Sequence, residues 1–72
     1  MNKINEETLN ITTRKFLKNV GVNSQRIIET AIRDSVNSGE IASSKTVKVS
    51  VNLKIDELNI EEKITGNIEV EI

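Results

Sequence analysis

The sequence predicts an α+β fold of order α, α, β, β, in which two amphipathic helices pack on one face of an antiparallel β-hairpin. Two observations predict this fold. Near the C-terminus, apolar residues alternate with polar ones in two segments, as in half-buried strands. Upstream, apolar residues recur every three or four positions, as in helices with one buried face. The alternating positions are Val47, Val49, Val51, Leu53 and Ile55, followed by Ile64, Gly66, Ile68, Val70 and Ile72.

The first helix is expected over about residues 6–20. Asn5 suits an N-cap, and Glu6 and Glu7 place negative charge in the first turn, where it interacts favourably with the helix dipole. Gly21 follows, and glycine readily adopts the left-handed conformation that ends many helices, so we expect a tight turn there. The residues expected on the buried stripe are Leu9, Thr13, Phe16, Leu17 and Val20.

The second helix is expected over about residues 24–38, ending before Gly39. Its apolar and small residues cover nearly half of the helix circumference. One face of a two-stranded hairpin and one neighbouring helix cover only part of such an arc. We therefore expect the rest of it to contact something else. The residues of this arc are Ile27, Ile28, Ala31, Ile32, Ser35 and Val36.

The strands are expected over about residues 46–55 and 63–72, and residues 1–72 form one small domain. Their register is predicted from side-chain matching. If Ile55 faces Ile64, the five inward-facing pairs match, whereas a longer slip of the second strand buries Glu62 opposite Leu53. The first register is therefore preferred. The predicted core contains Phe16, Leu17, Ile28, Ile32, Val49, Val51, Ile68 and Val70.

Composition limits both stability and function. A domain of 72 residues obtains only about 3 to 5 kcal/mol from its core, and the chain has neither Cys nor His to add a disulfide or a zinc site. The residue types behind most nucleophilic and proton-transfer catalysis (His, Cys, Tyr) are also missing. We therefore expect a non-catalytic interaction or self-association module, with no catalytic residues, no cofactor and no metal site.

Charge and hydropathy indicate where such a module works. The net charge is −1, with both signs interspersed, so no overall field favours nucleic acid or an anionic membrane. The N-terminal residues lack the apolar core of a signal peptide, and no apolar run reaches the length of a membrane span. A cytoplasmic location is therefore expected.

Without a disulfide or a zinc site, self-association is the remaining way to stabilise so small a domain. We therefore expect a homodimer. The wide arc of the second helix, at Ile28, Ile32 and Val36 in particular, is one candidate interface. A strand edge is another, because pairing two edges across a two-fold axis makes a four-stranded sheet. Ile11 is a third, since it lies off the core stripe of the first helix. An unidentified protein partner is the alternative to a second copy.

The predicted order of helices and strands is also compatible with a different function, nucleic-acid binding. Two helices joined by a short turn and followed by a hairpin resemble a DNA-binding helix-turn-helix with a wing, which would present Ser24, Gln25 and Arg26 to the bases. Glu29 lies between Arg26 and Arg33 on the same helical face, however. Phosphate binding needs clustered positive charge, so nucleic-acid binding is the runner-up interpretation.

Several segments form a set that is specific in combination: residues 5–11, 14–17, 20–22, 24–26 and 56–58, together with Gly66. Together these segments resemble a family of short bacterial proteins classed as a domain of unknown function. The resemblance covers nearly the whole chain. It implies a bacterial cytoplasmic origin and no assigned activity, so it transfers no site residues.

Overall fold

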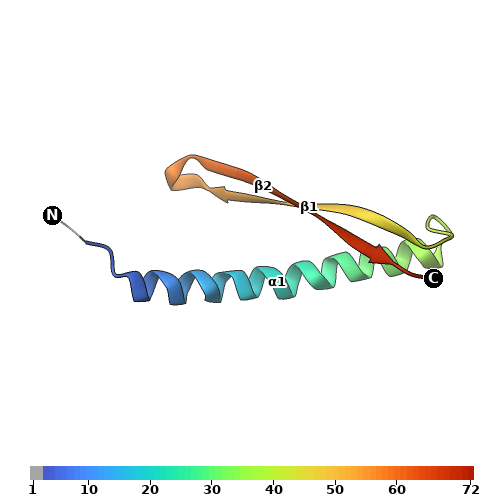
Figure 1. Ribbon diagram of the computed structural model, residues 1–72, viewed down its shortest axis with the longest axis horizontal. Helices are drawn as coiled ribbons and strands as arrows, with labels where there is room; N and C mark the ends of the chain where they lie inside the picture. The colour runs from blue at the N-terminus through green and yellow to red at the C-terminus, as the bar shows by residue number, and fades with distance from the viewer. Residues whose placement is uncertain (1–2) are drawn as a thin grey trace.

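The computed structural model describes residues 3–72 and contains one helix and one hairpin (Figure 1). Helix α1 spans Glu6–Asn37, and strands β1, Lys45–Ile55, and β2, Ile60–Val70, form an antiparallel two-stranded sheet. A short 3-10 turn, η1, Asp56–Leu58, lies between the strands. The predicted α+β class and hairpin are confirmed. The prediction of two helices is wrong, because a single helix of 32 residues replaces both.

Helix α1 continues through Gly21 because nothing at that point ends it. Gly39 is the glycine with positive φ in the described part of the chain, so Gly21 keeps the right-handed conformation. The side chain of Asn23 donates a hydrogen bond to the carbonyl of Asn19 at 2.9 Å, one turn back along the same helix. A glycine within a helix costs only about 1 kcal/mol relative to alanine. A second pair of helix ends would leave several more backbone groups without partners.

Both ends of α1 follow the predicted rules. Asn5 is the N-cap, and its side chain accepts a hydrogen bond from the backbone N–H of Thr8 at 3.1 Å. At the other end Gly39 adopts φ +87°, and its N–H donates to the carbonyl of Val36. Ile41 is half-buried, and its N–H donates to the carbonyl of Ser35, which folds the connecting loop back onto the helix end.

The hairpin register differs from the predicted one by four residues. Ile55 faces Ile60 instead of Ile64, and Leu53 faces Glu62, the pairing that was rejected on the ground that Glu62 would be buried. That reasoning fails because Glu62 remains exposed in the structure. A shift of an even number of residues leaves every side chain on its predicted face. The assignment of inward and outward positions therefore holds, although the pairs are wrong.

Local turn chemistry favours the observed register. Asn59 adopts the left-handed conformation, with φ 53° and ψ 39°, and its N–H donates to the carbonyl of Asp56 at 3.3 Å. Asn tolerates this conformation better than most residues, so the connection closes over residues 56–59. Polar contacts between the strands add to the pairing. Asn52 donates to Glu61 at 2.6 Å, and Thr46 donates to Glu69 at 3.0 Å.

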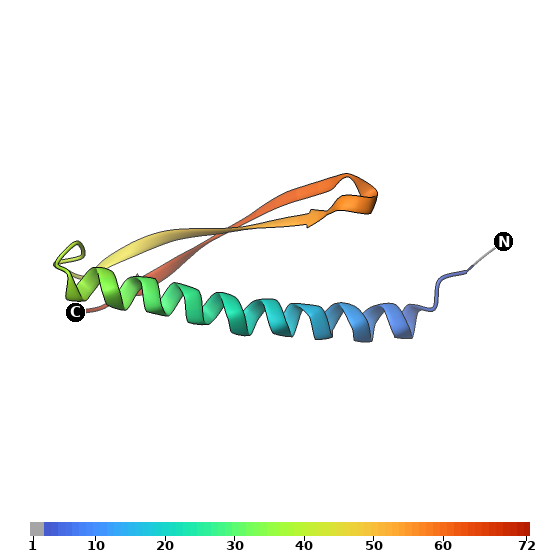
Figure 2. The same ribbon diagram turned by 180° about the vertical axis from the view of Figure 1, so that it is seen from behind.

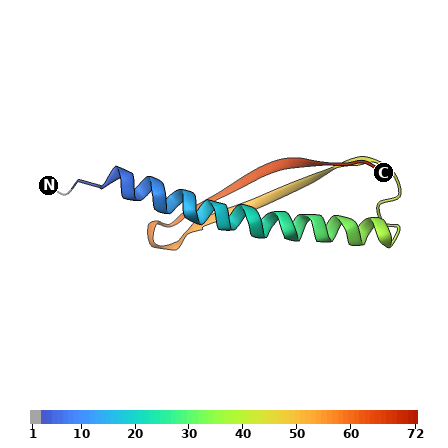
Figure 3. The same ribbon diagram turned by 90° about the horizontal axis from the view of Figure 1, so that it is seen from below.

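The hairpin starts at the C-terminal end of α1, returns along the helix and diverges from it toward its tip (Figures 1 and 2). Viewed from below, it crosses the helix at an angle (Figure 3). The resulting shape is long and thin, 59 × 22 × 15 Å. Its radius of gyration is 17.1 Å, whereas about 11 Å is typical of a compact domain of 72 residues.

The apolar contact between helix and hairpin is confined to the C-terminal half of α1. Val70 is the one apolar side chain in residues 3–72 that is buried, at 8% exposure. The predicted core is correct for half-buried positions on both elements but wrong for Phe16, Leu17 and Val51, which are exposed because the hairpin has diverged from the helix at their level. The half-buried apolar residues are Val20, Ile28, Ile32, Val36, Ile41, Val47, Val49, Leu53 and Ile68.

Replacing Gly21 with alanine should stabilise the protein. A Cβ at this position meets no atom within 4 Å, and the backbone is helical. Alanine is favoured over glycine within a helix by about 0.5 to 1 kcal/mol, which corresponds to a rise of several degrees in thermal midpoint. Gly39→Ala is the matched control and should lower the midpoint, since φ is +87° there. A lower midpoint for Gly21→Ala would indicate a turn at Gly21 and contradict the single helix.

Candidate functional site

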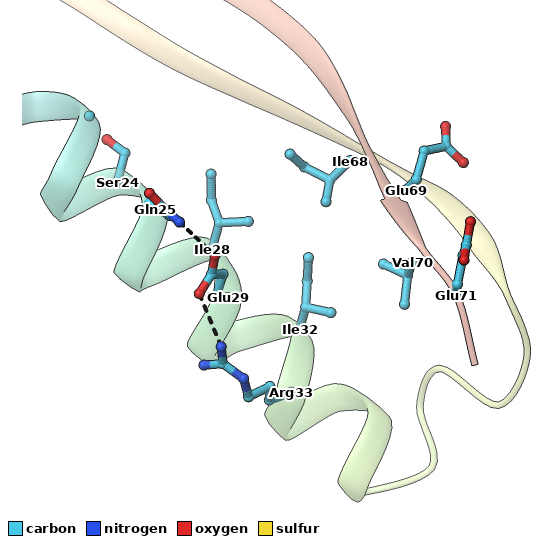
Figure 4. Close-up of a pocket in the computed structure, with 11 residues that line it drawn as sticks. Ser24, Gln25, Ile28, Glu29, Ile32, Arg33, Ile68, Glu69, Val70 and Glu71 are labelled. Atoms are coloured by element: carbon cyan, nitrogen blue, oxygen red, sulfur yellow. Dashed lines mark hydrogen bonds and ion pairs between the residues drawn. The ribbon is translucent and has the colours of Figure 1, made fainter.

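The first candidate site is an open groove between α1 and β2, of about 580 Å³. Its floor is apolar, with Ile28 and Ile32 pointing from the helix toward Ile68 and Val70 on the strand (Figure 4). Since these residues also make the contact between helix and hairpin, the groove is the open side of the core. We call it the β2-side groove. Its other lining residues are Gly21, Ser24, Gln25, Glu29, Arg33, Glu69 and Glu71.

The polar side chains of this groove largely satisfy one another along the helix. Gln25 donates to one carboxylate oxygen of Glu29 at 2.9 Å, and Arg33 donates to the other at 3.0 Å (Figure 4). The hydrogen bond from Gln25, followed by that from Arg33, lowers the pKa of Glu29 below its ordinary value. Glu29 therefore stays ionised at neutral pH and is suited to an ion pair. A general acid or base would need a pKa nearer to neutrality.

A second groove, with a volume of about 310 Å³, lies between α1 and β1 and shares Ser24 and Ile28 with the first. We call it the β1-side groove. It is mostly apolar, and it has no charged side chain among its lining residues. The sequence did not predict either groove, because each forms only where the helix and the diverging hairpin meet at a particular angle. The lining residues are Ser24, Ile27, Ile28, Val49, Ser50 and Val51.

The residues predicted as an interface lie at two different levels along α1, because Ile11 is about 25 Å from Ile28 along the helix axis. Ile28, Ile32 and Val36 are half-buried on the side of the hairpin, and the first two line the β2-side groove. Ile11 is 57% exposed, on a part of the helix that the hairpin does not cover. The structure therefore does not bring these four residues together into one patch. Their role in association stays a prediction.

The residues of the runner-up interpretation lie in the middle of α1. Ser24 is half-buried in the grooves, Gln25 binds Glu29, and Arg26 donates to the side chain of Asn23 at 3.0 Å. The turn expected at Gly21 is absent, since the helix continues through it. The three residues therefore do not begin a separate recognition helix. This removes the geometric basis of the helix-turn-helix interpretation.

Neither a metal centre nor a membrane span was found within residues 3–72. No three carboxylates lie close enough together to hold a metal ion in that part of the chain. The described helix is too polar to cross a bilayer.

The comparison with protein families gives the same result as the sequence motifs. Residues 4–71 match the model of a family described as "Family of unknown function (DUF6494)". The chain belongs to this family. The resemblance noted from residues 5–11 and the segments that follow is thereby confirmed. Searches of the curated proteins and of the solved structures found no match. DUF6494 membership assigns no activity, so the function has to be argued from the structure.

We expect this DUF6494 chain not to bind duplex DNA at about 50 mM salt, where phosphate contacts are strongest. The reason is that Glu29 neutralises Arg33 and accepts from Gln25 on the only helix in the described residues. Electrophoretic mobility shift is the measurement. Salt-dependent binding that is lost in the double variant Gln25→Ala, Arg26→Ala would contradict this expectation and restore the runner-up function.

Proposed function

We propose that this protein is a non-catalytic self-association module that functions as a homodimer. The observation that supports the proposal is the surface the chain leaves in water. Its accessible surface is 6675 Å², whereas a folded monomer of 8.0 kDa typically exposes about 4,450 Å². The excess is about 2,200 Å² per chain.

The exposed apolar residues lie on both elements of the fold. Leu9, Phe16 and Leu17 are exposed on the N-terminal half of α1, and Ile60 and Ile64 are exposed on β2. Single exposed apolar residues are ordinary on protein surfaces. Here, however, the exposed set is larger than the set that packs, and only one side chain in residues 3–72 is buried. Large apolar surfaces of this kind mark interaction sites.

A second argument is energetic. Ordering a residue costs about 1 to 2 kcal/mol of backbone conformational entropy, and burial of apolar surface is the main term that offsets it. A long helix touching a two-stranded hairpin along half its length buries little. A two-stranded hairpin by itself is also marginal in water. Association with a second chain supplies the missing burial without a disulfide or a metal.

A second copy is proposed as the partner because closed homodimers are the commonest oligomers and need no other component. The charge balance is compatible with self-contact, since a net charge of −1 repels a like chain only weakly. A cytoplasmic location is part of the same proposal. The module contributes an assembled surface, and no reaction is assigned to it.

The test of this proposal is the dependence of mass and stability on concentration. Sedimentation should give a dimer at micromolar concentration, and the thermal midpoint should rise when the protein is concentrated a hundredfold, because mass action favours the associated state. A monomer at about 100 μM with a midpoint that does not change on dilution would contradict the proposal.

A further inference from the structure

We infer that two copies pair through an antiparallel contact between their α1 helices, with the two-fold axis crossing the pair at the level of residue 18. The inference rests on the proposed homodimer and specifies its interface. The contact is made by a line of residues along one flank of the helix, which we call the seam. The seam consists of Leu9, Thr13, Phe16, Val20, Asn23 and Ile27.

The spacing of the seam is that of a coiled-coil contact. Its successive steps are four, three, four, three and four residues, so that its members repeat every 3.5 positions on average, as the a and d positions of a coiled coil do. This line exists only because α1 continues through Gly21, which joins its two halves. Three of its four apolar members are largely open to solvent, with exposures of 45% for Leu9, 56% for Phe16 and 66% for Ile27, and the fourth, Val20, is half-buried.

The chain's own hairpin leaves most of the seam uncovered and comes close to it only near Ile27, which lines the β1-side groove. The hairpin packs on the side of α1 that carries Ile28 and Ile32. At 100° per residue, the centre of the seam is about 120° away from that side around the helix axis. The helix therefore has two apolar faces. One packs against the hairpin of the same chain, and the other, apart from Ile27 beside the β1-side groove, lies away from the hairpin.

The seam is complementary to itself when a second copy runs in the opposite direction. With the axis at residue 18, Leu9 faces Ile27 of the second copy, and Phe16 faces Val20. The two polar members, Thr13 and Asn23, face each other. In each facing pair, both side chains are then apolar or both are polar. The largest side chain, that of Phe16, faces the smaller side chain of Val20. A parallel pair would instead place Phe16 against Phe16 and Asn23 against Asn23.

Charge distribution supports the same face. Between residues 9 and 31, Arg26 is the one charged side chain on the seam or on the positions directly beside it. The other charged residues of that stretch lie elsewhere on the helix: Arg14, Lys15, Lys18 and Glu29. Coiled-coil contacts are flanked in this way by a solvated face that carries the charge. Antiparallel pairing also sets the helix dipoles in opposite directions, which is electrostatically favourable.

The β1-side groove extends the contact from helix to hairpin. Ile27 lines this groove together with Val49 and Val51. Leu9 of the second copy, which faces Ile27, would therefore enter an apolar groove of about 310 Å³. Two such insertions, one in each chain, are related by the two-fold axis. The exposed apolar side of the hairpin thereby gains a neighbour.

The excess accessible surface of two chains is in the range that permanent homodimers bury. Each chain exposes about 2,200 Å² more than a compact monomer of its mass. Two chains together therefore expose an excess of about 4,400 Å². Obligate homodimers bury about 2,000 to 5,000 Å² in total, so the excess falls in their range and above the area of most transient contacts.

A charge exchange across the seam tests the register. Leu9→Glu and Ile27→Lys should each raise the dimer dissociation constant at least tenfold, because each places a charge against an apolar side chain. The double variant Leu9→Glu, Ile27→Lys should bind more tightly than either single variant, since the new charges face each other across the two-fold axis. Val22→Lys is the matched control. Val22 is 61% exposed but off the seam, so dimerisation should not change.

A double variant no tighter than the weaker single variant would overturn the antiparallel register, because parallel pairing sets like charges opposite each other. Loss of dimer in Val22→Lys, with the seam variants unaffected, would place the interface on the other face. Sedimentation measures the dissociation constants in each case.

Distances between spin labels test the direction without altering the seam. Single nitroxide labels are attached at Thr8→Cys, Lys15→Cys and Val22→Cys in a chain that has no other cysteine. In an antiparallel pair the labels move apart by about 3 Å along the axis for each residue away from position 18. The labels at position 8 should therefore be at least about 10 Å farther apart than those at positions 15 and 22.

The outcomes separate this inference from the function on which it rests. Equal distances at the three positions in a protein that sediments as a dimer overturn the antiparallel seam and leave the homodimer standing. No dipolar coupling at any position in a protein that sediments as a monomer overturns both. A long distance at position 8 with shorter ones at the other two positions supports both.

Discussion

The contact between one face of α1 and the inward face of β2 holds this chain in its observed shape. Ile28 and Ile32 meet Ile68 and Val70 there, and nothing else in residues 3–72 packs to comparable burial (Figure 4). A helix of 32 residues is about 48 Å long, and a hairpin only two strands wide covers part of one of its sides. The apolar surface beyond that contact has to be covered by another molecule. The elongated shape, the open grooves and the proposed dimer all follow from this shortage of covering surface.

The hairpin was predictable because its signal is local and strong. Alternation of apolar and polar residues identified both strands and the face of each side chain, and the faces hold in the structure. The second strand, expected over about residues 63–72, spans Ile60–Val70 instead. The register was predicted wrongly because side-chain matching was given more weight than the turn. Asn59 in the left-handed conformation closes a short connection. The cost expected for Glu62 does not arise, since the helix is too far away to bury it.

The single helix was not predicted because Gly21 has two opposite interpretations. Glycine followed by Val22, Asn23 and Ser24 has the residue types of a helix end and a new cap. Whether such a glycine ends a helix depends on whether the following segment buries more apolar surface by turning back than by continuing the helix. Here the hairpin covers only the C-terminal half of the helix, so turning back would have to bury both halves against the same small sheet. That balance is set by tertiary packing, and no single segment of the sequence contains it.

The candidate site was predictable in kind but not in place. Composition without His, Cys or Tyr favoured association over catalysis, and the wide apolar arc of residues 24–38 suggested a partner. The grooves and the seam depend on the angle at which the hairpin leaves the helix and on the continuity of α1. Only after the helix is known to be continuous do Leu9 and Ile27 belong to one line.

Small-angle X-ray scattering tests the central claim most directly, because it gives mass and shape from one sample. The account predicts a scattering mass of twice 8.0 kDa and a radius of gyration of at least the 17.1 Å found for one chain. A mass of 8.0 kDa with a radius of gyration near 11 Å would mean that the chain covers its own apolar surface as a compact monomer, and would contradict the account.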